Sequence, residues 1–140
     1  MIRFTVYGTA VPQGSARAFV PKGWTRAVIT SDNPKLKSWR QELTKAAMVA
    51  CQDHDVPIPA NVAVAVIVGF YFAKPKSTKK SVVAKVTKPD VDKLLRSVLD
   101  GLEGVVYAHD AQVTDARVAK YYGLPERAEI AVGLAEQGAT

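Results

Sequence analysis

Alternation of apolar and polar side chains predicts the strands of this chain. Residues 1–8 have the period-2 pattern of a half-buried strand. The longer run at 61–73 is apolar on both faces, so we expect a central strand that is buried on each side. Within residues 105–134 the pattern predicts three more strands, of which the first, at 105–107, is short.

Two segments have the helical spacing of apolar residues. The first helix is expected at 34–52, with Asn33 as its cap and Pro34 at its first position. The second is expected at 90–103, ending before Gly104, because glycine readily adopts the left-handed conformation that follows a helix. Its apolar stripe consists of Val91, Leu94, Leu95, Val98 and Leu102.

These elements predict an α/β (α+β) fold in one domain, residues 1–140, with two main helices packed on a single mixed sheet of four to five strands. A hydrophobic content of 48% is sufficient for a core, in which we expect Trp39 and the single cysteine, Cys51. The chain has no hydrophobic signal region after Met1, and its apolar runs are too short to cross a membrane. We therefore expect a cytoplasmic protein.

Three aspartates are candidates for metal ligands. Asp90 and Asp92 stand at the start of the second helix, and Asp110 follows that helix in a turn. If the next strand returns along the sheet, Asp110 lies near the start of the helix, where three carboxylates need a compensating cation. Oxygen ligands of this kind suit Mg²⁺ or Mn²⁺. Each aspartate also has a structural explanation, as a helix cap, as an i,i+4 partner of Arg96, or as a turn residue.

Positive charge is concentrated just before these aspartates. The segment from Ala73 to Arg96 has a net charge of +6, which equals the formal net charge of the whole chain. A positive field beside carboxylates fits a polyanion that binds through its phosphates, although a solvated lysine loop has the same composition. We expect residues 74–88 to form a mobile loop. The candidate DNA-binding lysines are Lys74, Lys76, Lys79, Lys80, Lys85, Lys88 and Lys93.

Residues 9–31 are rich in turn formers and basic side chains. Backbone N–H groups of residues 13–15 can approach a phosphate closely, and Arg17 can pair with it. An ordinary surface hairpin that turns at 21–23 explains the same composition equally well.

The segment KPDVDKLLRSVLDGL, followed by GVVY and HDAQV, resembles the RusA-type Holliday junction resolvases of bacteria and their prophages. The resemblance is strong over residues 86–118 and weaker in PQGSAR. It implies that Asp90, Asp92 and Asp110 bind metal. Arg96 stands at the position of the family's catalytic lysine, and Asp100 at that of an aspartate near the helix end.

The resemblance implies a metal-dependent, structure-specific endodeoxyribonuclease that resolves four-way DNA junctions by paired nicks in recombination and repair. The expected cofactor is Mg²⁺, with Mn²⁺ as a substitute. The family is homodimeric, and a two-fold dimer places one carboxylate site on each of two symmetric strands. The resemblance also favours DNA contact over a plain hairpin for residues 9–31, with Arg17 as a contact.

Three residues depart from the family pattern: Lys93 replaces asparagine, Arg96 replaces lysine, and His109 replaces an aspartate. Arginine stabilises phosphate charge but cannot act as a general acid. We expect catalysis to be retained, with Asp100 orienting Arg96 or Lys93. His109 is either an outer metal partner or an ordinary turn residue.

Two other functions are consistent with the sequence. A protein that binds branched DNA without cutting it fits the basic segment and the three departures. A different Mg²⁺-dependent phosphoesterase is the second alternative, because metal ligands do not specify the substrate.

Overall fold

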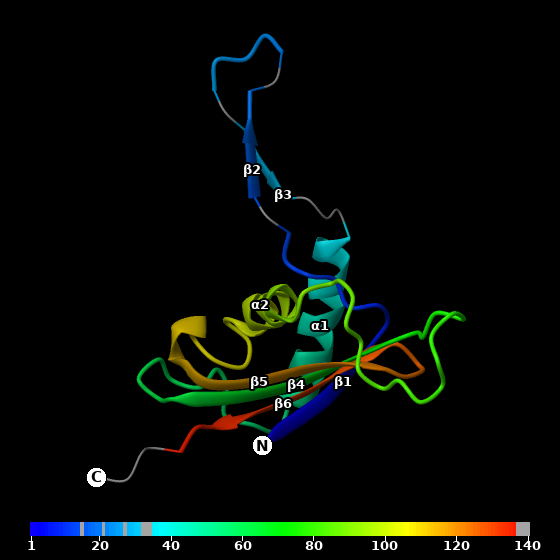
Figure 1. Cartoon of the computed structure of the whole chain (residues 1–140). Helices are drawn as coiled ribbons and strands as arrows, with labels where there is room; N and C mark the ends of the chain where they lie inside the picture. Colours follow the sequence, from blue (N-terminus) through cyan, green and yellow to red (C-terminus); the bar gives the residue numbers. More distant parts are fainter. Residues whose placement is uncertain (15, 21, 27, 32–34, 137–140) are drawn as a thin grey trace.

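The computed structural model describes residues 1–14, 16–20, 22–26, 28–31 and 35–136, and the side chains of all of these except 16–19 and 28–31. Its main sheet has the strand order β1-β6-β4-β5 (Figure 1). The strands are β1 (Ile2–Tyr7), β4 (Val64–Phe72), β5 (Val113–Tyr122) and β6 (Arg127–Leu134). β4 and β5 are parallel, whereas the β1–β6 and β4–β6 pairs are antiparallel. The predicted mixed sheet with two helices is confirmed.

Helices α1 (Leu36–Ala50) and α2 (Val91–Leu102) cover one face of this sheet (Figure 1). Both form where apolar periodicity predicted them, although Asn33 and Pro34, the expected start of α1, lie outside the described residues. α2 begins after Asp90 in extended conformation and ends before Gly104, which has a φ of +79°. The predicted stop at this glycine is confirmed.

The two helices contact each other closely through a glycine of α2. A Cβ atom on Gly101 would lie 2.4 Å from Cδ2 of Leu43, so the close approach depends on the missing side chain. It allows the Thr44 hydroxyl to donate to the Gly101 carbonyl oxygen at 3.0 Å. Trp39 is 5% exposed, as predicted, and its indole N–H donates to the Ser97 hydroxyl of α2. Cys51 is also buried in this core.

The opposite face of the sheet is open. Along β4 the residues that face the helices are buried, but Ile67 on the other face is 43% exposed. The prediction that this strand is buried on both sides is therefore wrong. The sequence is misleading because the open face carries small or apolar residues, such as Ala65 and Gly69, rather than charged ones.

A two-stranded ribbon, β2 (Ala16–Phe19) paired with β3 (Val28–Ser31), projects from the body on the side of the helices (Figure 1). The structure therefore contains a hairpin within residues 9–31, one of the two interpretations of this segment, and DNA contact by it stays a prediction. No helix in the described residues is both long and apolar enough to span a membrane.

The basic segment 74–88 joins β4 to α2 and is anchored along β5. Lys85 N–H donates to the Lys120 carbonyl oxygen, and Tyr122 N–H donates to that of Val83. The Lys85 ammonium group also lies over the ring of Tyr122, 5.5 Å from its centroid. These contacts attach part of the segment to a strand edge, and its expected mobility stays a prediction.

Candidate metal centre at the end of α2

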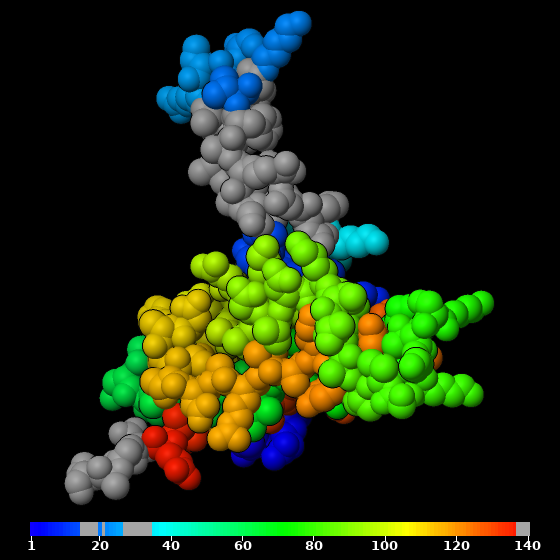
Figure 2. Space-filling view, in the orientation of Figure 1, coloured from blue at the N-terminus to red at the C-terminus, as the bar shows by residue number. Residues whose placement is uncertain are grey.

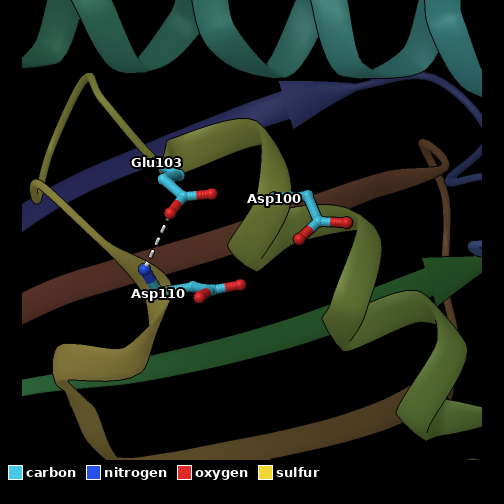
Figure 3. A group of neighbouring side chains, drawn as sticks. All are labelled: Asp100, Glu103 and Asp110. Carbon is cyan, nitrogen blue, oxygen red and sulfur yellow. Dashed lines mark hydrogen bonds between the residues drawn. The ribbon is translucent and has the colours of Figure 1, made fainter.

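Three carboxylates meet where α2 ends. Asp100 and Glu103 come from the last turn of the helix and its cap, and Asp110 comes from the following turn (Figure 3). Their nearest carboxylate oxygens all lie within 4.8 Å of one another, and no other such group of three occurs in the described part of the chain. Asp100 is half-buried, while Glu103 and Asp110 are exposed. Their side chains are therefore accessible to a ligand from solvent.

The turn that carries Asp110 is held by two buried side chains. The Tyr107 hydroxyl donates to the Leu99 carbonyl oxygen at 2.6 Å, which ties the turn to the last part of α2. Gln112, 7% exposed, accepts a hydrogen bond from His109 N–H and donates to the carbonyl oxygens of Pro59 and Val62. The short 3₁₀ helix Asp110–Gln112 thus has a fixed position against α2.

The segment just before this turn contains no strand. Residues 104–106 form a turn, and Tyr107 makes only isolated bridges to Ile58 and Glu103. The predicted strand at 105–107 is wrong. The apolar run there is buried, with Val106 and Tyr107 fully inaccessible, because it packs in the core rather than because it joins the sheet.

The carboxylates affect each other's protonation. Burial raises the pKa of Asp100, the Arg40 guanidinium opposes this shift, and Asp110 adds to it. Burial also raises the pKa of the Tyr107 hydroxyl well above its usual value, so that this group remains a hydrogen-bond donor. The cluster therefore has negative charge that Arg40 only partly compensates, and a divalent cation would stabilise it.

Arg40 on α1 connects this cluster to the base of the ribbon. Its Nη2 donates to Asp100 Oδ2 at 2.9 Å and also contacts the side-chain oxygen of Gln13. Gln13 N–H in turn donates to the Lys93 carbonyl oxygen on α2. Arg40 thus contacts both α2 and the segment that leads to β2. Its Nε is buried without a partner among the described residues.

Asp90 and Asp92 lie at the opposite end of α2 and are not members of the cluster. Asp90 is the N-cap residue, and Asp92 lies in the first turn of the helix; both are exposed. The expectation that Asp110 returns to this end is wrong, because Asp110 precedes β5. It is the far end of β5 that returns, where the Lys120 ammonium group donates to the carbonyl oxygens of Thr87 and Pro89.

Acidic residues from both ends of α2 nevertheless lie on the same side of the helix. Asp92, Arg96 and Asp100 follow at four-residue intervals and so lie along the same side of the helix. Arg96 is exposed, and its charge, like that of Arg40, opposes the rise that burial causes in the pKa of Asp100. Asp92 lies about 12 Å from Asp100 along the axis. The direct partner of Asp100 is Arg40, rather than the expected Arg96 or Lys93.

The basic residues differ in how they are held. Lys74 donates to the carbonyl oxygens of Lys79 and Lys80, and Lys85 donates to the Thr87 hydroxyl, so both stabilise the basic segment itself. Lys93 lies 4.0 Å from Asp90. The other candidates in this segment form no ion pair with any described residue and are exposed; they are Lys76, Lys79, Lys80 and Lys88. Arg17 lies on β2, where side chains are outside the described part.

Comparison with known proteins places this chain in a family. The family model for endodeoxyribonuclease RusA matches residues 10–133, which include both helices, the ribbon and all of the acidic residues described above. This chain belongs to the RusA family. An uncharacterised protein of Bacillus subtilis (strain 168), YqaN, is 33% identical over 141 residues, which cover 94% of each chain.

RusA proteins are metal-dependent nucleases that act on branched DNA. The carboxylate cluster fits this requirement, because three oxygen ligands within 4.8 Å of one another are the donors that a hard divalent cation prefers. The cation itself is not identified by this geometry.

Sequence reasoning missed three residues of this site. Glu103 was detectable, because it lies one helical turn after Asp100 and hence on the same side. Arg40 and Gln112 left no local signal: their partners are 60 and about 50 residues away in the chain. His109, the third departure from the family pattern, is exposed, and its Nδ1 lies 3.7 Å from a Glu103 oxygen.

Proposed function

We propose that this RusA-family protein resolves Holliday junctions by paired nicks, as a metal-dependent endodeoxyribonuclease of recombination and repair in the cytoplasm. The observation that carries the proposal is the acidic side of α2, which begins just after the basic segment and has Asp110 beside its end, within the matched region. Carboxylates beside a basic segment fit a nucleic acid that is held by its phosphates over a metal ion.

Asp90, Asp92 and Asp110 are the proposed ligands of one or two Mg²⁺ ions, for which Mn²⁺ can substitute. Because Asp110 lies at the opposite end of α2 from Asp90 and Asp92, the proposal assigns a separate ion to each end. When bound, the cation supplies activation of water and neutralisation of the charge that develops on the phosphate. The turn fixed by Tyr107 and Gln112 holds the backbone of Asp110 in place beside the end of α2. This fixed placement reduces the reorganisation that binding requires.

Arg96 is the proposed phosphate-binding residue of the site. It is exposed and lies between Asp92 and Asp100 on one side of α2. Its charge persists at any working pH, so it stabilises negative charge on the phosphate without transferring a proton. Arg40 of α1 pairs with Asp100, which lies one turn from Arg96 on the same side of α2.

DNA is proposed to lie along the helix side of the molecule, held at its phosphates by Arg17 and the basic segment. The lysines that make no ion pair with described residues contribute most directly, while Lys74 and Lys85 also maintain the shape of the segment. We further propose a homodimer, because a four-way junction offers two symmetric strands to one two-fold enzyme. Sedimentation of the purified protein, with and without junction, tests this stoichiometry.

The function is tested with a synthetic mobile four-way junction incubated with Mg²⁺ or with EDTA. We expect paired symmetric nicks that need Mg²⁺. Asp110→Asn should lower the single-turnover rate at least about 100-fold, since the cation contributes several kcal/mol at about 1.4 kcal/mol per factor of ten. Asp115→Asn is the matched control, because it makes the same chemical change at an exposed residue of β5 outside the cluster.

The alternatives give different results in this assay. Tight junction binding without cleavage under Mg²⁺ or Mn²⁺ would identify a junction-binding protein and reject the nuclease. Equal cleavage of junction, flap and linear DNA would identify a less selective phosphoesterase.

A further inference from the structure

The tip of the ribbon exposes a tryptophan between two cations. Residues 22–26 lie between β2 and β3, and Lys22, Trp24 and Arg26 are all exposed. The tip stands clear of the body (Figure 2). Gly23 has a φ of +84°, a conformation that permits a tight change of direction immediately before Trp24.

Trp24 differs sharply from the other tryptophan of the chain. Trp39 is 5% exposed and its N–H group has a partner, whereas Trp24 is 60% exposed and makes no ring or cation contact with any described residue. A single exposed apolar side chain is common on protein surfaces and does not identify a binding site. The position on a projecting ribbon and the two flanking cations are what distinguish Trp24.

We propose that Trp24 stacks on a base at the branch point of the DNA, while Lys22 and Arg26 contact the flanking phosphates. This inference rests on the proposed function and identifies a specificity determinant for it. An indole can stack on any base, because every base presents a π-face, and the two cations complement the phosphates on either side.

Such an arrangement would favour branched over linear DNA. Within a linear duplex both faces of each base pair are already stacked, so an inserted side chain must first separate them. At a junction the stack is interrupted, and the base faces there are available at lower cost. Trp24 would therefore contribute to junction affinity far more than to duplex affinity.

The first experiment measures the environment of Trp24 directly. Because the chain has two tryptophans, the Trp39→Phe variant has Trp24 as its single indole. We expect its emission to be quenched on titration with a four-way junction in EDTA, where cleavage is blocked. If Trp39→Phe fails to fold by circular dichroism, the difference in emission between the wild type and Trp24→Phe provides the same measurement.

The second experiment measures affinity by fluorescence anisotropy, with a labelled junction and a linear duplex of the same arm sequence. Trp24→Ala should weaken junction binding about tenfold or more and duplex binding less than about twofold. Trp24→Phe should retain most of the junction affinity. Leu124→Ala is the matched control, because Leu124 is a large apolar side chain, 74% exposed, in the turn between β5 and β6.

The outcomes separate this inference from the proposed function. Junction binding that leaves Trp24 emission unchanged, or an equal loss for junction and duplex in Trp24→Ala, would overturn the stacking role and leave the nuclease intact. Quenching by a junction that is never cleaved would support the stacking role and reject the nuclease. A wild-type protein that does not bind the junction would reject both.

Discussion

The two ends of α2 carry acidic residues in different environments. At the beginning, Asp90 and Asp92 are exposed, and the nearest cation, Lys93, lies 4.0 Å from Asp90. At the end, Asp100 is half-buried and hydrogen-bonded to Arg40 at 2.9 Å. The first end is open to a ligand, while the second is held by contacts from α1 and from the following turn. A single helix thus has two separate groups of acidic residues, and the group at its end is held by more contacts.

The largest expected difference between the two ends concerns catalysis. Asp92→Asn should reduce the single-turnover rate on a junction at least about 100-fold, as for a lost metal ligand. Glu103→Gln should reduce it less than about tenfold, because Glu103 lies beside the proposed ligands. Both changes are isosteric and remove one charge, so each is a control for the other.

Calorimetric titration with Mg²⁺ in the absence of DNA compares the same two variants by their metal binding instead of their cleavage rate. Weaker Mg²⁺ binding in Asp92→Asn than in Glu103→Gln would support ligands at the beginning of α2. The reverse order, in binding and in rate, would move the metal to the cluster of Asp100, Glu103 and Asp110.

An intermediate effect is expected at Arg40, which holds the second end. Arg40→Gln should lower the free energy of unfolding in urea by about 1–2 kcal/mol, because the pair with Asp100 is only 32% and 30% exposed. It should also slow cleavage by about tenfold, because Arg40 holds Asp100 beside the proposed ligand Asp110. Arg40→Lys should restore part of the stability through its charge.

The control for Arg40 is available on the same helix. Lys45 pairs with Glu42 at 3.6 Å, but their side chains are 73% and 63% exposed. Lys45→Gln should therefore change stability by less than about 0.5 kcal/mol. Equal losses in Lys45→Gln and Arg40→Gln would show that charge on α1, rather than contact with Asp100, accounts for the effect.

The contrast between the ends of α2 also explains what the sequence predicts and what it does not. Apolar spacing is a local property, so it located α2 and its stop at Gly104 correctly. It also showed that Asp92, Arg96 and Asp100 share one side of the helix. Whether Asp110 lies beside the beginning or the end of α2 depends on the fold of residues 104–112. Contacts of Tyr107 and Gln112 with residues outside this segment determine that fold.

Long-range contacts account for the other errors. Small side chains on the open face of β4 have the same apolar pattern as buried ones, so the sequence alone did not distinguish a covered face from an open one. Likewise, the sequence does not distinguish Arg40 from the other basic residues of α1, because only the fold places it beside Asp100. The two tryptophans illustrate the same limit. Helical spacing identified Trp39 as a core residue, but no local pattern showed that Trp24 lies at the tip of a ribbon.

The smallest effect is expected at Lys93, which stands where the family has asparagine. The Lys93–Asp90 pair is long, and its side chains are 43% and 48% exposed, so water screens it. Lys93→Asn should change the free energy of unfolding by less than about 0.5 kcal/mol and the cleavage rate by less than about threefold. Junction binding should depend slightly less on salt, because one cation is lost. A rate increase of tenfold or more would instead show that the Lys93 charge competes with the metal for Asp90, and that the open end of α2 is less accessible than its exposure indicates.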